Sequence, residues 1–313
     1  MNKMKKIGLT ALAASLVSVS ANAVDISGGS ALTYAGGNDG VAGNPWSMTD
    51  NLTFSWGGEL DNGFTVDMSF LLDNSDGAAA QIFDNRTLAI GMGDAGTLTF
   101  WGQAGSGVVG SFDDRTPNAY EESWNGGDSP NQGHSTSNMF YYTNSLDAAT
   151  IHASYTPQGT GSDAASTEIG VVVTAIDNLE LYGAVGTDNA SSSGVDNTIV
   201  GAKFTMGGAT LGVQMNEADS EATNGDEEFT AWSVSYAVSE DLSVAYGAST
   251  IDYETASKED QDSVGISASY TMGSMTLAGV LNSIDNQNLT AATGAGNQDS
   301  NTDTFEINLS FAF

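Results

Sequence analysis

Apolar and polar residues alternate one by one along much of this chain. In the C-terminal stretch TDTFEINLSFAF, the apolar residues Phe305, Ile307 and Leu309 are separated by Glu306 and Asn308. The same alternation occurs in the stretches 64–70, 200–206, 211–216, 242–249 and 263–272. Side chains that repeat with a period of two lie on opposite faces of a β-strand. The pattern therefore predicts strands with one apolar and one polar face.

The segments between these predicted strands fall into two length classes. Very short turns occur at 61–63, 93–96, 146–148, 177–178, 207–208, 240–241 and 273–274. Longer loops, rich in Gly, Ser, Asp and Asn, occur at 36–46, 74–80, 157–165, 188–196, 217–227, 254–261 and 286–301, and a much longer one spans 103–137. Counting between these breaks predicts about sixteen strands, at a spacing typical of hairpins.

Alternating short and long connections are typical of an outer-membrane barrel. Lipid offers no hydrogen bonds, so a sheet can cross a bilayer only when it is closed and has no free edge. About sixteen strands are enough to enclose a water-filled lumen. We therefore expect an all-β fold, a closed antiparallel transmembrane β-barrel with short periplasmic turns and long extracellular loops. Its polar faces would line the lumen.

The N-terminus has the features of a secretory signal peptide. Lys3, Lys5 and Lys6 precede an apolar stretch at 7–19, and the small-residue signature Ala21-Asn22-Ala23 follows it. This order of charge, apolar run and cleavage site predicts export, and the apolar run is too short to be a membrane span. We expect cleavage near Ala23, which leaves 24–313 as the barrel domain.

Charge and composition restrict the possible partners. The chain has 39 acidic residues against seven basic ones, a formal net charge of -32, and no cysteine. Without residues 1–23, only four basic residues remain: Arg86, Arg115, Lys203 and Lys258. So acidic a chain is not expected to bind nucleic acid. The absence of cysteine excludes metal sites built on thiolates.

Several stretches resemble the Gram-negative general porins of the sixteen-stranded trimeric type. They are the first strand VDISGGSALTYAGG, the arm GDAGTLTFWGQ before the long loop, the hairpin SNMFYYTNSLDAATIHASYTPQ after it, and the last strand FEINLSFAF with a terminal Phe313. The resemblance covers essentially all of 24–313.

This resemblance implies an outer-membrane channel for passive diffusion of small hydrophilic solutes and ions. Phe313 would be the assembly signal read by the barrel-assembly machinery. The resemblance also implies a homotrimer set in outer-membrane lipid and lipopolysaccharide. Its subunit interface would lie on the early strands, where Gly28, Ser30 and Gly91 are small candidates for the outward face.

In such porins the third loop folds into the lumen and narrows it, so the resemblance assigns this role to 103–137. A solvated surface loop is the alternative, although a loop of this length needs a reason. The charged residues of this candidate constriction are Asp113, Asp114, Glu121, Glu122 and Asp128, with Arg115 as its base.

The wall of the predicted pore has few basic residues. Arg86 stands where porins often have an arginine, but it shares its parity with Leu88 and Ile90, which should face lipid, so a bulge or an interfacial position is equally open. Lys203 faces inward by parity, and Gln103 replaces another arginine that is frequent in the family. We expect an acidic pore that prefers cations.

Other functions find less support in the residues. His134 and His152 are the only histidines, and neither lies in a recognisable catalytic arrangement, so an enzyme is not expected. The acidic run Asp226-Glu227-Glu228 could hold Ca²⁺ through oxygen ligands, although a solvated loop is the more common outcome. A secreted or surface-attached β-structured adhesin is the alternative of a different class, and the terminal aromatic residue favours the barrel.

Overall fold

The computed structural model describes residues 24–37, 44–73, 83–129, 135–159, 164–189, 194–255, 258–286 and 301–313. The predicted signal peptide 1–23 and His134 lie outside these ranges. In the described part, no helix is long and apolar enough to cross a membrane.

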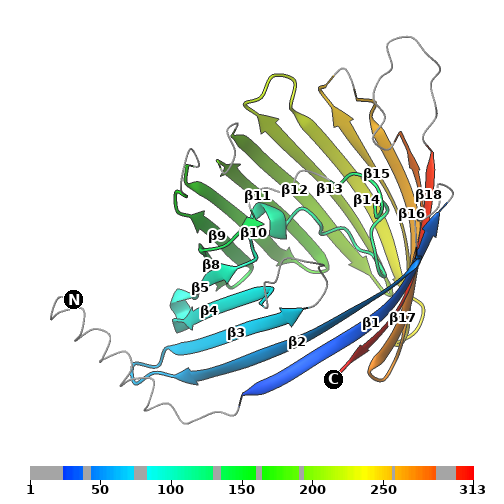
Figure 1. The fold of residues 1–313 in the computed structure, drawn as a ribbon. Coiled ribbons are helices and arrows are strands. Elements are labelled where there is room, and N and C mark those ends of the chain that lie inside the picture. The colour runs from blue at the N-terminus through cyan, green and yellow to red at the C-terminus, as the bar shows by residue number, and fades with distance from the viewer. Residues whose placement is uncertain are drawn as a thin grey trace.

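Sixteen strands of the described residues form one closed antiparallel barrel (Figure 1). They are β1 (Asp25–Gly37), β2 (Trp46–Glu59), β3 (Thr65–Asp73), β4 (Asn85–Gly91), β5 (Thr97–Gln103), β8 (Met139–Leu146), β9 (Ala149–Thr156), β10 (Ser166–Ile176), β11 (Leu179–Asp188), β12 (Val195–Met206), β13 (Ala209–Ser220), β14 (Glu227–Ala237), β15 (Leu242–Tyr253), β16 (Gln261–Met272), β17 (Met275–Asp285) and β18 (Thr302–Ala312). The predicted fold class is confirmed.

The last strand closes the ring by pairing with the first. The register of β1 and β18 runs from Gly29 opposite Ala312 to Gly37 opposite Thr304. Beyond β18, Phe313 N donates to Gly28 O at 3.0 Å and Gly28 N donates to Phe313 O at 3.2 Å. The alternating C-terminal stretch is therefore the seam of the barrel, and closure removes the free edge that lipid could not satisfy.

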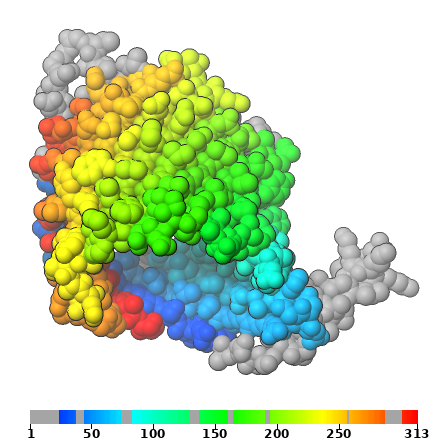
Figure 2. All heavy atoms as spheres, turned by 180° about the vertical axis from the view of Figure 1, so that it is seen from behind, coloured from blue at the N-terminus to red at the C-terminus, as the bar shows by residue number. Residues whose placement is uncertain are grey.

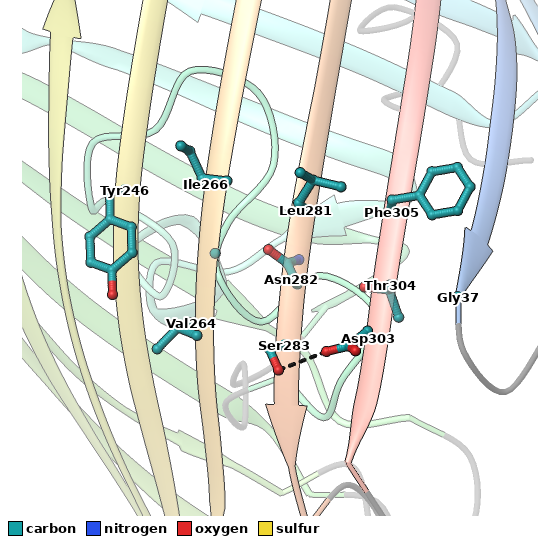
Figure 3. A pocket seen from close by; sticks show the side chains of 11 residues that line it. Gly37, Tyr246, Val264, Ile266, Leu281, Asn282, Ser283, Asp303, Thr304 and Phe305 are labelled. Atoms are coloured by element: carbon teal, nitrogen blue, oxygen red, sulfur yellow. Dashed lines mark hydrogen bonds between the residues drawn. The ribbon is translucent and has the colours of Figure 1, made fainter.

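The two faces of the strands follow the alternation in the sequence. Apolar side chains such as Ile266, Leu281 and Met215 are more than half exposed on the outside. Figure 3 shows the outward side chains of Tyr246, Val264, Ile266, Leu281 and Phe305 along a groove of about 550 Å³ over β15–β18. The intervening residues are mostly small or polar and point into the lumen.

The barrel wall is uneven in height. The strands β3, β4 and β5 have 9, 7 and 7 residues, whereas β12, β13, β15 and β16 have 12 each. Figure 1 shows the wall of β1–β5, here called the low wall because it contains these three short strands, in front of the tall wall of β10–β16. The strands β1 and β2 at its other edge are long, with 13 and 14 residues. Figure 2 shows the outer surface of the tall wall from behind, with the hollow of the lumen opening beneath it.

Candidate functional site

The segment between β5 and β8 runs through the lumen and is bonded to the tall wall. It begins with the short strand β6 (Gly105–Ser106), which pairs with β7 (Ser135–Thr136), and continues through a 3₁₀ turn, η2 (Val109–Ser111). Figure 1 shows it crossing the inside of the barrel. The prediction that this loop folds into the lumen is therefore confirmed, and the alternative of a solvated surface loop is wrong.

Hydrogen bonds fix this loop to successive strands of the wall. Val108 N donates to Ser154 Oγ of β9 at 3.1 Å, and Arg115 N donates to Gln214 Oε1 of β13 at 3.1 Å. Further along, Asn125 O accepts from Asn282 Nδ2 of β17 at 2.8 Å and from Thr304 Oγ1 of β18 at 3.2 Å. The loop thus spans the wall from β9 to β18, and polar side chains of the wall satisfy these backbone groups inside the lumen.

Two apolar clusters hold the loop in addition to these bonds. At one end, Val108, Val109 and Phe112 are fully buried against a wall cluster that comprises Val172, Tyr182, Ala184 and Ile199. At the other end, Trp124 packs edge-on against Phe229 with ring centroids 5.0 Å apart, beside Ala231 and Ile251. Among the described residues, both apolar clusters lie between this loop and the wall, so the loop excludes water from these parts of the wall.

Three inward-facing glycines let the loop lie against the strands. A Cβ at Gly170 would meet Val108 Cγ1 at 2.7 Å, one at Gly212 would meet Pro117 Cδ at 2.2 Å, and one at Gly265 would meet Ser123 Cα at 2.8 Å. The first and second contacts are with side-chain atoms and the third is with backbone. The sequence contains 38 glycines, so nothing in it singled out these three.

Asp113, Asp114 and Glu122 form an acidic group on the loop. Asp113 is only 3% exposed, and burial together with the neighbouring Asp114 raises its pKa to about 8. The carboxyl groups of Asp114 and Glu122 hydrogen-bond to each other, an arrangement that requires a proton between them. Burial and Asp114 raise the pKa of Glu122 to about 7, and burial also raises the pKa of Asp114.

Two further acidic residues of the predicted constriction lie at other points of the loop. Burial raises the pKa of Glu121, and the carboxylate of Glu306 on β18 adds to this effect. The hydroxyl of the neighbouring Tyr120 donates a hydrogen bond to the carboxylate of Glu306. Asp128 is tied to the wall, because its Oδ2 accepts from Tyr253 Oη at 2.8 Å and its N donates to Gln261 Oε1 at 2.9 Å.

The two bases of the lumen share one carboxylate. Arg115 Nη2 and Lys203 Nζ each lie 2.9 Å from Glu180 Oε1. The guanidinium of Arg115 also lies over the rings of Phe112 and Tyr182, 4.9 and 5.0 Å from their centroids. With Asp114 they line a polar cavity of about 890 Å³ beside the turn at 177–178.

Glu180 is a candidate site residue that the sequence analysis missed. It stands directly opposite Lys203 in the register of β11 and β12, two positions after the predicted turn at 177–178. Since directly opposite residues of a hairpin face the same way, the turn and the inward parity of Lys203 could have identified this pair.

Arg86 does not belong to the lumen cluster. It lies opposite Phe70 in the register of β3 and β4, on the outward row with Leu88 and Ile90, and its Nη2 donates to Gly102 O at 3.4 Å. Its assignment to the constriction is therefore corrected: the parity of the strand decides its direction. The assignment of Gly91 to the outward face is also corrected, because Gly91 pairs with the inward-facing Thr65. A Cβ at this position would meet Thr65 Oγ1 at 2.4 Å inside the barrel.

Across the lumen from the loop, the inward face of strands β1–β5 has no basic side chain. The inward rows of β1–β5 consist mainly of Ser, Thr, Asn, Ala and Gly, and their charged members are Asp25, Glu59, Asp67 and Asp73. The acids of the loop therefore face neutral or acidic side chains across the open part of the lumen.

The remaining chemistry-bearing residues have structural contacts. His152 lines the lumen, where its Nδ1 lies 3.1 Å from Tyr141 Oη and its ring packs edge-on against Phe112. Asp226 Oδ1 accepts from Ser220 N at 2.9 Å, and Glu227 lies 3.7 Å from Lys258 Nζ. In the described ranges, no three His, Asp or Glu side chains converge as metal ligands would, and the Ca²⁺ site stays a prediction.

Comparisons with known proteins agree with this architecture. OmpT, an outer membrane protein of Vibrio cholerae, superimposes with a TM-score of 0.71 at 15% sequence identity, covering 95% of this chain and 100% of that one. A triple mutant of the Rhodopseudomonas blastica porin superimposes with a TM-score of 0.68 at 17% identity, covering 93% and 100%. No curated protein sequence matches the chain.

The sequence model of the Gram-negative porin family matches residues 8–313. The secreted adhesin is not favoured, because the strands form one closed barrel with a loop inside it. The chain therefore belongs to the Gram-negative porin family and forms a channel in the outer membrane.

Proposed function

We propose that this porin is a passive diffusion channel for small hydrophilic solutes and ions, and that it prefers cations. Passage through such a channel depends on the width of the lumen and on the charges that line it. The width is set by the barrel and by the loop fixed to its tall wall. The preference would come from the lining charges, which are mostly carboxylates.

One observation carries the cation preference. The open part of the lumen is bounded by the acidic loop on one side and by β1–β5 on the other, and these five strands present no inward base. The bases that do reach the lumen, Arg115 and Lys203, are both held on Glu180. A low-dielectric wall focuses the resulting negative potential into the channel.

We expect the reversal potential across a potassium chloride gradient to show cation preference at low salt. The preference should fade as salt rises, because the screening length falls from about 10 Å at 0.1 M to about 3 Å at 1 M. Single-channel recording in planar bilayers near both concentrations measures this. Anion preference at the lower concentration would refute the proposal and would mean that the free charge of Arg115 and Lys203 dominates the narrowest point.

The oligomer that we propose is a homotrimer in outer-membrane lipid and lipopolysaccharide. A solved structure of OmpT from Vibrio cholerae is described as the trimer form, and it superimposes with a TM-score of 0.71 at 13% identity, covering 93% of this chain and 99% of that one. The outward rows of the early strands would supply the interface, and both Gly28 and Ser30 lie on them. We further propose cleavage of the exported chain near Ala23.

Deleting Phe313 should lower the amount of assembled barrel in the outer membrane and leave the conductance of the surviving channels near that of the intact protein. The residue is 76% exposed on the outside, and its deletion removes the two backbone bonds to Gly28 at the seam. No lumen contact is lost. Quantifying folded protein in outer-membrane fractions, with single-channel recording of the purified variant, tests both halves. Unchanged membrane levels would contradict a role as the signal for the barrel-assembly machinery.

A further inference from the structure

Asp50 is a charged residue in an apolar stretch of the outer surface. It lies on the outward row of β2, opposite Ser30 and between Met48 and Leu52. The same row continues to Trp46 at one end and Trp56 at the other, and aromatic residues typically mark the two membrane interfaces of a barrel. Asp50 is thus placed between the interfaces, where a charge that faces lipid is unfavourable.

Two other outward acids, Asp262 and Asp303, differ from Asp50 in both position and partners. Asp262 and Asp303 lie toward the ends of their strands that carry the long loops, and each accepts a hydroxyl hydrogen bond: from Thr250 Oγ1 at 2.7 Å and from Ser283 Oγ at 2.8 Å. Figure 3 shows the second of these bonds. The side chain of Asp50 has no hydrogen bond or ion pair among the described residues. Among the described residues, its carboxylate is therefore free to take a partner from a neighbouring subunit.

Only one basic side chain is available on the outward rows of the described barrel. Arg115 and Lys203 are bound to Glu180 inside the lumen, and Lys258 lies beside Glu227 and over the ring of Tyr253. The remaining base is Arg86, which is exposed on β4. Its one hydrogen bond in the described residues is the 3.4 Å contact to the carbonyl of Gly102, so most of its donors make no hydrogen bond to the described part of the chain.

Asp50 and Arg86 cannot pair within one subunit. The register joins Phe54 to Phe70 and Phe70 to Arg86, so Arg86 lies two strands away from Phe54. Asp50 lies four residues from Phe54 along β2. With a rise of about 3.3 Å per residue and a strand spacing of about 4.8 Å, their Cα atoms are roughly 16 Å apart.

The two residues nevertheless lie at nearly the same height in the membrane. The line of paired residues through Met275, Phe311, Ser30 and Asp50 starts beside the short turn at 273–274 and rises toward the long loops. The line from Phe54 to Arg86 rises in the same direction. Both residues therefore lie above Phe54, Asp50 by four residues along β2 and Arg86 by two strand spacings. For a strand tilt of about 40°, these two heights differ by about 4 Å. An arginine side chain spans that difference.

We propose that Asp50 of each subunit forms an ion pair with Arg86 of the neighbouring subunit in the trimer. This proposal rests on the trimer proposed above. Rotation about an axis along the membrane normal preserves height, so a ring of copies can bring Asp50 of one against Arg86 of the next and close on itself. The small residues Gly28 and Ser30 beside Asp50 allow the neighbouring barrel to approach. An arginine fork is suited to such a desolvated carboxylate contact.

Replacing either partner should weaken the trimer, and exchanging the two should restore it. Asp50→Asn and Arg86→Gln are each expected to lower the temperature at which the trimer dissociates in detergent by roughly 10 °C, because each leaves one unpaired buried charge. The exchanged variant, Asp50→Arg with Arg86→Asp, should recover most of that loss. Asp61→Asn is the matched control, since Asp61 lies in the exposed turn after β2 and should change nothing.

A proximity test covers the case in which a charge variant fails to assemble. The chain has no cysteine, so Asp50→Cys with Arg86→Cys supplies the only thiols. A short bifunctional thiol reagent should link this double variant into covalent trimers, while neither single variant links. The ion pair would be refuted if neither charge variant changed the stability of the trimer, or if the single cysteine variants cross-linked as readily as the double one. Either outcome would leave the proposed channel function unaffected. A monomeric intact protein by native mass measurement would refute the proposed trimer, and the ion pair with it.

Discussion

Replacing Glu180 with glutamine should remove most of the cation preference of the channel at about 0.1 M salt. Glu180 Oε1 lies 2.9 Å from both Arg115 Nη2 and Lys203 Nζ, and its charge offsets theirs. Without it, two uncompensated cations face the cavity beside Asp114. One elementary charge at about 7 Å in water is worth roughly RT, so the permeability ratio of cation to anion should fall about threefold or more. Reversal potentials of purified channels measure the ratio.

Two variants fix the sign of this effect. Lys203→Gln should change the ratio in the opposite direction, because it removes a cation and leaves Arg115 paired with Glu180. Combining it with Glu180→Gln should bring the ratio back toward that of the intact channel. Glu240→Gln makes the same chemical change on the exposed turn before β15, outside the lumen, and serves as the control. A Glu180→Gln channel with undiminished cation preference would show that this ion cluster lies off the conduction path.

Raising the pH from about 6 to about 9 should increase cation preference and low-salt cation conductance. The pKa of Asp113 is raised to about 8 and that of Glu122 to about 7, and the pKa of Asp114 is raised as well, in each case chiefly by burial. An acid with a raised pKa is neutral at the lower pH and charged at the higher one. The loop therefore gains negative charge across this range, whereas exposed carboxylates are already ionised. Each added charge should raise the ratio by a factor of roughly three at low salt.

The double variant Asp113→Asn with Glu122→Gln should flatten this pH dependence, and Asp61→Asn should leave it unchanged. A pH profile of the intact channel that is flat between about 6 and 9 would contradict the assignment of these carboxyls to the conduction path.

The same pKa shifts predict the direction in which pH acts on the docking of the loop. A carboxyl whose folded-state pKa lies above its unfolded value binds its proton more tightly when folded. Its contribution to docking is complete below the unfolded value and is lost as the pH rises through the folded one. For Asp113 and Glu122 this loss runs from near pH 4 to near pH 8, with the apolar contacts of Phe112 and Trp124 still in place.

The sequence by itself determined the architecture of this protein. A strict period of two fixes which side chains face lipid and which face water, as with Ile307 against Glu306, and lipid permits only a closed sheet. Turn lengths then gave the strand number and singled out the loop at 103–137. Parity likewise placed Lys203 in the lumen. Parity alone would also have placed Arg86 on the outside, but the resemblance to the family assigned it to the pore.

Only the tertiary structure decided which side chains contact one another in the lumen. Loop residues have no period, so nothing local relates Asp114 to Glu122, or Arg115 to Glu180 65 positions away. The register of the strands brings Glu180 opposite Lys203, and closure of the ring carries Glu306 of the last strand to the hydroxyl of Tyr120. The close fit at Gly170, Gly212 and Gly265 exists because the loop lies on those strands. Contacts between a loop and a distant wall depend on where every strand of the ring sits, which is a property of the closed barrel and of no single stretch of sequence.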